Sequence, residues 1–291
     1  MGVLCSLAAA VVWALAIILL KKSVETVSPF ALNLYRVVIT SILFVATLAV
    51  MGTTPWGVAS TRDCLILFAS GVIGIAVSDT LFHVGLQLMG AGLTAIVDCL
   101  YSPFVALLAF LWLGEKLGPS QLAGMGLVIA GVLVASAHAP PRGVTRRRLV
   151  GGFACGVLAM LTVAVGIVIA KPTLERTPLI WATAMRQFGA LGVLLPVAAI
   201  SPHRRLHARV LLPGRAWRYL LPAAVLGSYL ALILWICGMK LLAAGAAAIL
   251  NQTSTIFVLV LAAALLRERF TKRKLAACAL AVGGIVLVAL G

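Results

Sequence analysis

The chain has 291 residues, of which 63% are hydrophobic and only 10% are charged. A soluble globular protein carries about 25% charged residues, so this composition excludes that class and predicts an integral membrane protein. The formal net charge is +16, but most basic residues lie in alternate loops between apolar runs. We therefore expect these residues to contact lipid, and we expect no nucleic-acid partner.

Ten apolar runs follow one another along the chain, each long enough for a membrane-spanning helix. The loops between them are short and leave no room for a soluble domain. The expected fold is an all-α integral membrane protein with ten transmembrane helices. The runs cover residues 3–20, 30–50, 65–89, 93–113, 120–138, 149–170, 179–200, 218–239, 244–266 and 275–290.

The second half of the chain repeats the first. Matched glycines and glutamates in residues 74–137 and 227–290 are separated by one constant offset (227 − 74 = 153; 268 − 115 = 153). Further upstream the offset is 150, as between Arg36 and Arg186. An internal repeat of this length indicates that one structural unit has been duplicated.

Five spans per half is an odd number, so the second half enters the membrane from the opposite side. We therefore expect two inverted five-helix repeats, a construction that places the substrate site near the middle of the bilayer. The expected domains are a first repeat over residues 1–138, a basic linker over 139–148 and a second repeat over 149–291.

The distribution of basic residues predicts an orientation. With loops counted in chain order, the odd-numbered loops hold 16 of the 23 Lys and Arg, and the even-numbered loops hold 5. The positive-inside rule then places the odd loops in the cytoplasm and both termini outside the cell membrane. In this orientation the basic loops contact anionic lipid headgroups.

Charged residues within the first-half spans form a candidate coupling site. Arg36, His83 and Asp98 lie roughly 9–11 Å from the same membrane face, and Asp79 lies one turn deeper. An acid within a span is a functional candidate. We expect Asp79 and Asp98 to carry protons, with Arg36 and His83 as their partners.

The second half places different polar residues at a similar depth from the opposite face. Arg186, Asn251 and Gln252 lie there, with no acid at that depth. We expect Arg186 to receive a substrate carboxylate, and Tyr101, Tyr229, Asn251 and Gln252 to line the binding cavity.

Structural roles remain open for several of these residues. Arg36 and Arg186 could extend to the membrane interface, or they could pair with Glu268 and Glu115 respectively. Asp98 could form a purely structural ion pair with Arg36.

The sequence contains no catalytic constellation. DDxxD, HExxH and GxSxG patterns are absent, so we expect neither an enzyme nor a cofactor or metal site. An integral-membrane lipid-modifying enzyme and a packing subunit remain distant alternatives. The six cysteines are scattered without a CxxC pair and are expected to be free thiols.

Several features together resemble the drug/metabolite transporter superfamily, EamA type: an Arg early in spans two and seven, a Glu closing spans four and nine, and glycine-rich spans five and ten. The residues that carry the resemblance are Arg36, Arg186, Pro103, Gly114, Glu115, Glu268, Gly131 and Gly284. The chain departs from the pattern at Arg267, where a Gly is expected, and at Ile256, where the equivalent of Pro103 is expected.

The resemblance implies a secondary active transporter, most simply an exporter, of a small polar metabolite such as an amino acid. It would act by alternating access with proton coupling, as a monomer or weak homodimer. Because the superfamily also moves drugs and toxins, a multidrug or toxic-compound efflux carrier is the alternative.

Overall fold

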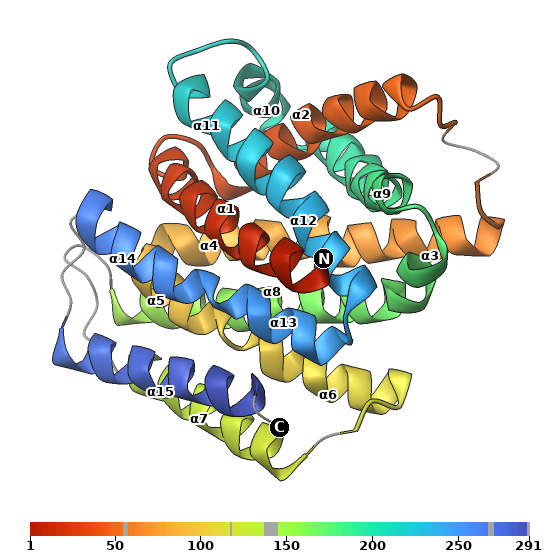
Figure 1. Ribbon diagram of the computed structural model, residues 1–291. Helices are drawn as coiled ribbons and strands as arrows, with labels where there is room; N and C mark the ends of the chain where they lie inside the picture. The colour runs from red at the N-terminus through yellow and green to blue at the C-terminus, as the bar shows by residue number, and fades with distance from the viewer. Residues whose placement is uncertain (55–57, 117, 137–144, 267–270, 290–291) are drawn as a thin grey trace.

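The computed structural model describes residues 1–54, 58–116, 118–136, 145–266 and 271–289. All regular secondary structure in these ranges is helical, which confirms the expected all-α class (Figure 1).

Each of the ten expected span positions contains a helical segment. Eight of these segments are long and apolar enough to cross a membrane. The other two positions contain shorter apolar stretches, Leu122–Val134 and Leu275–Leu287, within longer helices. The chain is therefore a multi-pass membrane protein.

The helices divide into two similar series. The first contains α1 (Gly2–Ser23), α2 (Pro29–Val50), α3 (Thr61–Gly71), η1 (Val72–Val77), α4 (Ser78–Met89), α5 (Ala91–Asp98), α6 (Tyr101–Leu113) and α7 (Pro119–Ser136). The second contains α8 (Arg146–Arg176), α9 (Leu179–Ile200), α10 (Arg204–Val210), α11 (Trp217–Ala223), η2 (Ala224–Leu230), α12 (Ala231–Leu241), α13 (Ala244–Gln252), α14 (Ser254–Leu266) and α15 (Lys272–Ala289).

The sixth span is longer than the sequence predicts. Helix α8 has 31 residues, whereas the predicted span covers residues 149–170. The last residues of the predicted linker 139–148 therefore belong to this helix. The part of that linker up to residue 144 lies outside the described residues.

Equivalent contacts recur in the two halves. Lys21 forms an ion pair with Glu25 at 3.8 Å, and 150 residues later Lys171 forms one with Glu175 at 2.6 Å. Gln87 donates to the Val24 carbonyl at the end of α1. At the equivalent positions Lys240 donates to the Leu174 carbonyl near the end of α8.

The third span of each half contains a π-helix at the equivalent position. Segments η1 and η2 interrupt α3–α4 and α11–α12, with Gly74 and Gly227 at equivalent positions inside them. A Cβ on Gly74 would lie 3.6 Å from the Gly166 backbone, and one on Gly227 would lie 2.9 Å from the Ala16 side chain. Small residues therefore let the first span of each half cross the π-helix of the other half.

The two halves interlock through their first helices. Helix α1 packs on η2, α12, α13 and α14, whereas α8 packs on η1, α4, α5 and α6. Figure 1 shows α1 beside α12 and α14, and α8 beside α4 and α5. Each half therefore completes the core of the other.

Helices α7 and α15 pack mainly on each other at the edge of the molecule, at the bottom of Figure 1. A Cβ on Gly131 would lie 2.8 Å from the Ala277 carbonyl oxygen, and one on Gly284 would lie 2.5 Å from the Gly124 carbonyl oxygen. The glycines thus allow close backbone approach.

Candidate functional site

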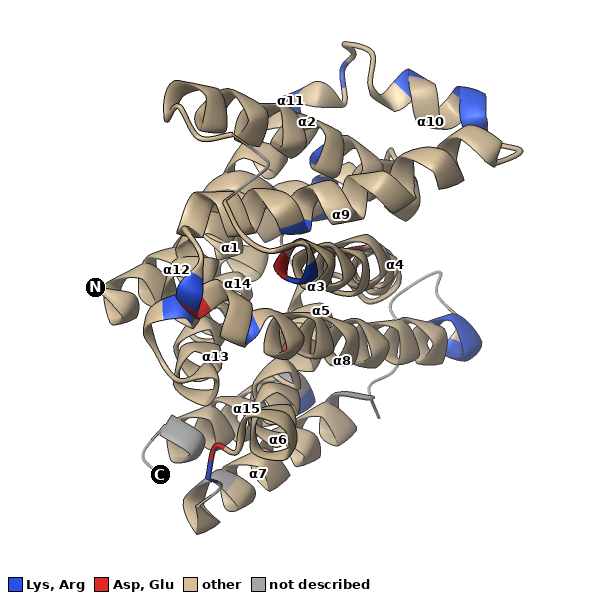
Figure 2. Cartoon of the chain, turned by 90° about the vertical axis from the view of Figure 1, so that its right-hand side faces the viewer, with Lys and Arg blue, Asp and Glu red and all other residues tan. Residues whose placement is uncertain are grey.

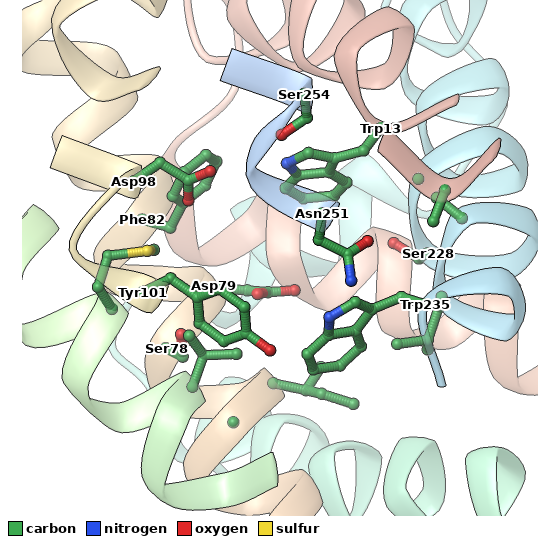
Figure 3. Close-up of a pocket in the computed structure, with 18 of the residues that line it drawn as sticks. Trp13, Ser78, Asp79, Phe82, Asp98, Tyr101, Ser228, Trp235, Asn251 and Ser254 are labelled. Carbon is green, nitrogen blue, oxygen red and sulfur yellow. The ribbon is translucent and has the colours of Figure 1, made fainter. Parts of the chain in front are cut away.

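A cavity of about 140 Å³ lies between the two halves. A buried water needs roughly 10–15 Å³ of such volume, so the cavity has room for several waters or one small solute. Aromatic side chains from four spans line it: Trp13, Phe82, Tyr101 and Trp235. Figure 3 shows the rings of Trp13, Tyr101 and Trp235 around the space that Asp79 and Asn251 face.

The lining residues come in equivalent pairs from the two halves. Gly74 and Gly227, Phe82 and Trp235, and Asp98 and Asn251 all line the cavity, and each pair is separated by the repeat offset. The cavity therefore lies on the axis that relates the two repeats. This is where inverted-repeat transporters place their substrate sites.

Arg36 is the centre of a buried polar cluster on the cavity wall. Its side chain is 2% exposed, and its Nε donates to the Ser228 hydroxyl at 2.7 Å. Nη1 lies 2.7 Å from His83 Nε2 and 3.4 Å from an Asp79 carboxylate oxygen. Ser228 comes from η2, whereas His83 and Asp79 come from α4, so the guanidinium joins the two halves.

The Arg36 contact decides the state of His83. A guanidinium can only donate, so His83 Nε2 must accept and the ring is neutral with its proton on Nδ1. Nδ1 is buried and has no hydrogen-bond partner among the described residues. His83 does not line the cavity; it contacts the lining residues Arg36 and Phe82.

Arg186 has a different environment from its equivalent Arg36. It is fully buried, and all three of its guanidinium nitrogens lack a hydrogen-bond partner in the described part of the chain. The guanidinium lies over the Trp235 ring, 5.4 Å from its centroid. A Cβ on the cavity-lining Gly74 would lie 3.3 Å from Nη2, so this charge lies directly behind the cavity wall, although Arg186 itself does not line the cavity.

The fourth and ninth spans are both broken at the cavity. The break falls between α5 and α6 after Asp98, and between α13 and α14 at Thr253. Pro103 favours the first break, because it cannot donate to the Cys99 carbonyl. Ile256 occupies the equivalent position in the second half, so proline is not required for the second break.

Polar groups from both broken spans meet at these breaks. Gln252 Nε2 donates to the Asp98 backbone carbonyl at 2.9 Å, and Asn251 Nδ2 donates to Ala247. The Asp98 carboxylate lines the cavity and forms no hydrogen bond or ion pair with any described residue. It is therefore available to a proton or a ligand.

The two candidate tyrosines lie in different places. Tyr101 lines the cavity, and its hydroxyl donates to Met239 Sδ at 3.9 Å. Tyr229 is not among the lining residues. Its ring packs on Phe44, and its hydroxyl lies 2.5 Å from the Thr47 hydroxyl. We leave Tyr229 out of the proposed site.

The alternative ion pairs considered from the sequence are wrong where the structure describes them. Arg36 pairs with Asp79 rather than with Asp98. Glu115 does not meet Arg186, because its carboxylate accepts from the Ala244 and Gly245 backbone amides at the start of α13. The positive end of the α13 helix dipole stabilises a carboxylate at this position. Glu268 lies outside the described residues.

Several lining residues were not selected from the sequence. Trp13, Phe82 and Trp235 carry no charge, and an aromatic residue in an apolar span is equally compatible with core packing or lipid contact. Phe82 and Trp235 are separated by the repeat offset, and this equivalence was the one sequence feature that could have marked them as lining residues. Gln187 and Ser228 also line the cavity and were missed.

Two interlocked, inverted five-helix repeats around a central cavity lined by aromatic and polar side chains define a membrane transporter. The chain belongs to the EamA-like transporter family, whose model matches residues 1–137 and again residues 150–290. The two matches fall one in each half, in keeping with the internal repeat.

Two further proteins are similar to this chain, one in sequence and one in fold. Over 124 residues the chain is 28% identical to an "uncharacterized transporter" of Archaeoglobus fulgidus, and the match spans 43% of each protein. The chain thus matches less than half of that relative's length. A solved protein crystal structure has the same fold, with a TM-score of 0.74 at 20% identity, over 99% of this chain and 96% of that one.

Proposed function

We propose that this protein is a secondary active transporter that exports a small polar metabolite, such as an amino acid, by alternating access coupled to protons. One observation carries the proposal: both repeats line a single cavity at equivalent positions, and acids and polar groups face into it. Rocking of one half against the other would open that cavity to each membrane face in turn.

The charges around the cavity support a substrate with both an amino and a carboxyl group. The unpaired Asp98 carboxylate would bind an ammonium group, with Asn251 and Gln252 beside it. The unpartnered Arg186 guanidinium behind Gly74 would attract a carboxylate. The aromatic side chains would pack on an apolar part of the substrate. A volume of about 140 Å³ favours a small molecule over a bulky drug.

The same acids support proton coupling. A proton on Asp79 would remove the negative partner of Arg36, and so would free the guanidinium that also bonds Ser228 of the other half to change its position. A proton on Asp98 would compete with a substrate ammonium at the same carboxylate. Proton entry and substrate exit would then be linked, which is the arrangement that an exporter driven by a proton gradient needs.

The proposed orientation in the membrane rests on the basic loops. Figure 2 shows basic residues at the start of α8 and over α10, at the end of the molecule away from the N-terminus. This distribution supports a cell-membrane protein whose basic loops lie in the cytoplasm against anionic headgroups. We propose a monomer or weak homodimer.

The test is solute counterflow in proteoliposomes that contain the purified protein. We expect exchange of one or more amino acids, and we expect a pH step across the membrane to drive net transport of the same solutes. Exchange restricted to hydrophobic cations would favour the multidrug efflux alternative. Turnover of a labelled lipid without solute exchange would overturn the proposal in favour of a membrane enzyme.

A further inference from the structure

Two cysteines that are 232 residues apart in sequence meet between the two halves. The sulfur atoms of Cys5 on α1 and Cys237 on α12 lie 2.7 Å apart. We propose that Cys5 and Cys237 form a disulfide site that fixes the first helix of one repeat to the third span of the other. Both cysteines are partly exposed, and each lies within four residues of the end of its helix, where the span nears the membrane surface.

Close packing around the pair holds the two sulfurs together. One residue further along each helix, a Cβ on Gly238 would lie 2.1 Å from the Ser6 hydroxyl oxygen. Near the end of α12, a Cβ on Gly2 would lie 2.9 Å from Leu242. Disulfides require Cβ atoms about 3.5–4.5 Å apart, which only closely packed helices provide.

The bond would form by thiol–disulfide exchange with a small-molecule or protein disulfide. One thiolate attacks the oxidant and displaces its first thiol, giving a mixed disulfide. The second thiolate attacks that intermediate and displaces the second thiol. Two electrons and two protons thus leave the cysteine pair and reduce one oxidant disulfide to two thiols. The predicted orientation places this end of the chain outside the cell, where disulfides persist.

The position of the pair gives the bond a consequence for transport, which rests on the proposed function. Cys5 lies one helical turn before the cavity-lining Ala9, and Cys237 lies two residues after the cavity-lining Trp235. The bond would therefore close the molecule just beyond the cavity at one end. Alternating access requires the halves to separate there, so the oxidised protein would not complete a cycle.

The repeat supplies a matched control. The equivalent of Cys5 is Cys155 on α8, and the equivalent of Cys237 is Val84 on α4. Cys155 therefore has valine at the position where Cys5 has its partner cysteine. The variant Val84→Cys would recreate the pair at the opposite end of the molecule.

The site is tested by peptide mapping of the purified full chain after treatment with oxidised glutathione. We expect a linked peptide containing Cys5 and Cys237, lost in Cys5→Ser and in Cys237→Ser, and a second link to Cys155 only in Val84→Cys. Full alkylation of both cysteines in the oxidant-treated wild type would overturn the site. Elution of the serine variants at the wild-type volume serves as the folding control.

The consequence is tested by counterflow with the same samples. We expect transport to fall in proportion to the linked fraction, to return with dithiothreitol, and to be insensitive to oxidant in Cys5→Ser. Undiminished transport by linked protein would overturn the gating consequence. Absence of transport in reduced wild type would contradict the proposed function instead, and the peptide map would still decide the disulfide.

Discussion

Arg36 Nη1 lies 2.7 Å from His83 Nε2, so the arginine donates and the histidine is held neutral. This contact makes His83 the acceptor for a buried charge rather than a proton carrier in the described state. The Asp79 carboxylate, 3.4 Å from the same nitrogen, then remains the acid that faces the cavity at this point.

Replacement of His83 should destabilise the protein through Arg36. His83→Ala leaves a buried Nη1 without its nearest acceptor, which costs about 1–3 kcal/mol. His83→Gln supplies an amide oxygen and should restore most of this. The measurement is the unfolding midpoint in detergent, and equal midpoints for Ala and wild type would rule out the contact.

Most of the fold follows from the sequence. The constant offset from Gly74 to Gly227 reveals the repeat, and the number of apolar runs shows that the two repeats are inverted. Both features can be counted along the chain without knowing how any helix is rotated. The sequence grouped Arg36 with both acids but did not predict that it pairs with Asp79 rather than with Asp98. This pairing depends on helix rotation, and the π-helix η1 shifts every later residue around the axis by up to about 100° per inserted residue.

The sequence also does not predict that the first helix of each half packs on the other half. Helices α1 and α8 have nearly uniform apolar surfaces, so no stripe marks the neighbour that each one contacts. The same uniformity concealed Trp13 as a cavity residue.

The two equivalent arginines should respond in opposite ways to removal of their charge. Arg186→Met removes a buried charge without hydrogen-bond partners in the described part of the chain and should raise the unfolding free energy by about 1–4 kcal/mol. Arg36→Met removes a partnered guanidinium and should lower it. Substrates with a carboxylate should lose affinity for Arg186→Met. Destabilisation by both variants to the same extent would contradict the assigned difference.

Asp98 should set the pH dependence of transport. In Asp98→Asn the side chain keeps its size but has no titratable carboxylate. The rate of counterflow should therefore lose the pH dependence that Asp98 contributes. The matched variant Asn251→Asp adds an acid at the equivalent position and should add a pH dependence. Unchanged pH profiles for Asp98→Asn would exclude it as a coupling residue.

Any side chain at Gly131 should destabilise the protein, because α7 and α15 are in close backbone contact there. Gly131→Leu forces the Ala277 backbone away and should cost about 1–3 kcal/mol or more through overpacking. Gly126→Leu is the control on the same helix, because no atom lies within 4 Å of a Cβ there. Thermal unfolding of both variants is the measurement, and equal losses would show that general helix effects, not the α15 contact, are responsible.

Thiol labelling of a cavity residue from each membrane face tests the central claim most directly. A Ser254→Cys variant, in a background with the native cysteines replaced, would be exposed in sealed vesicles to an impermeant maleimide from each side in turn. The exposed Val260→Cys serves as the lipid-facing control. The account predicts that position 254 reacts from both sides, at rates that substrate and pH change in opposite directions, while position 260 does not react. Reaction of position 254 from one side only under every condition, or from neither, would contradict alternating access to a shared cavity.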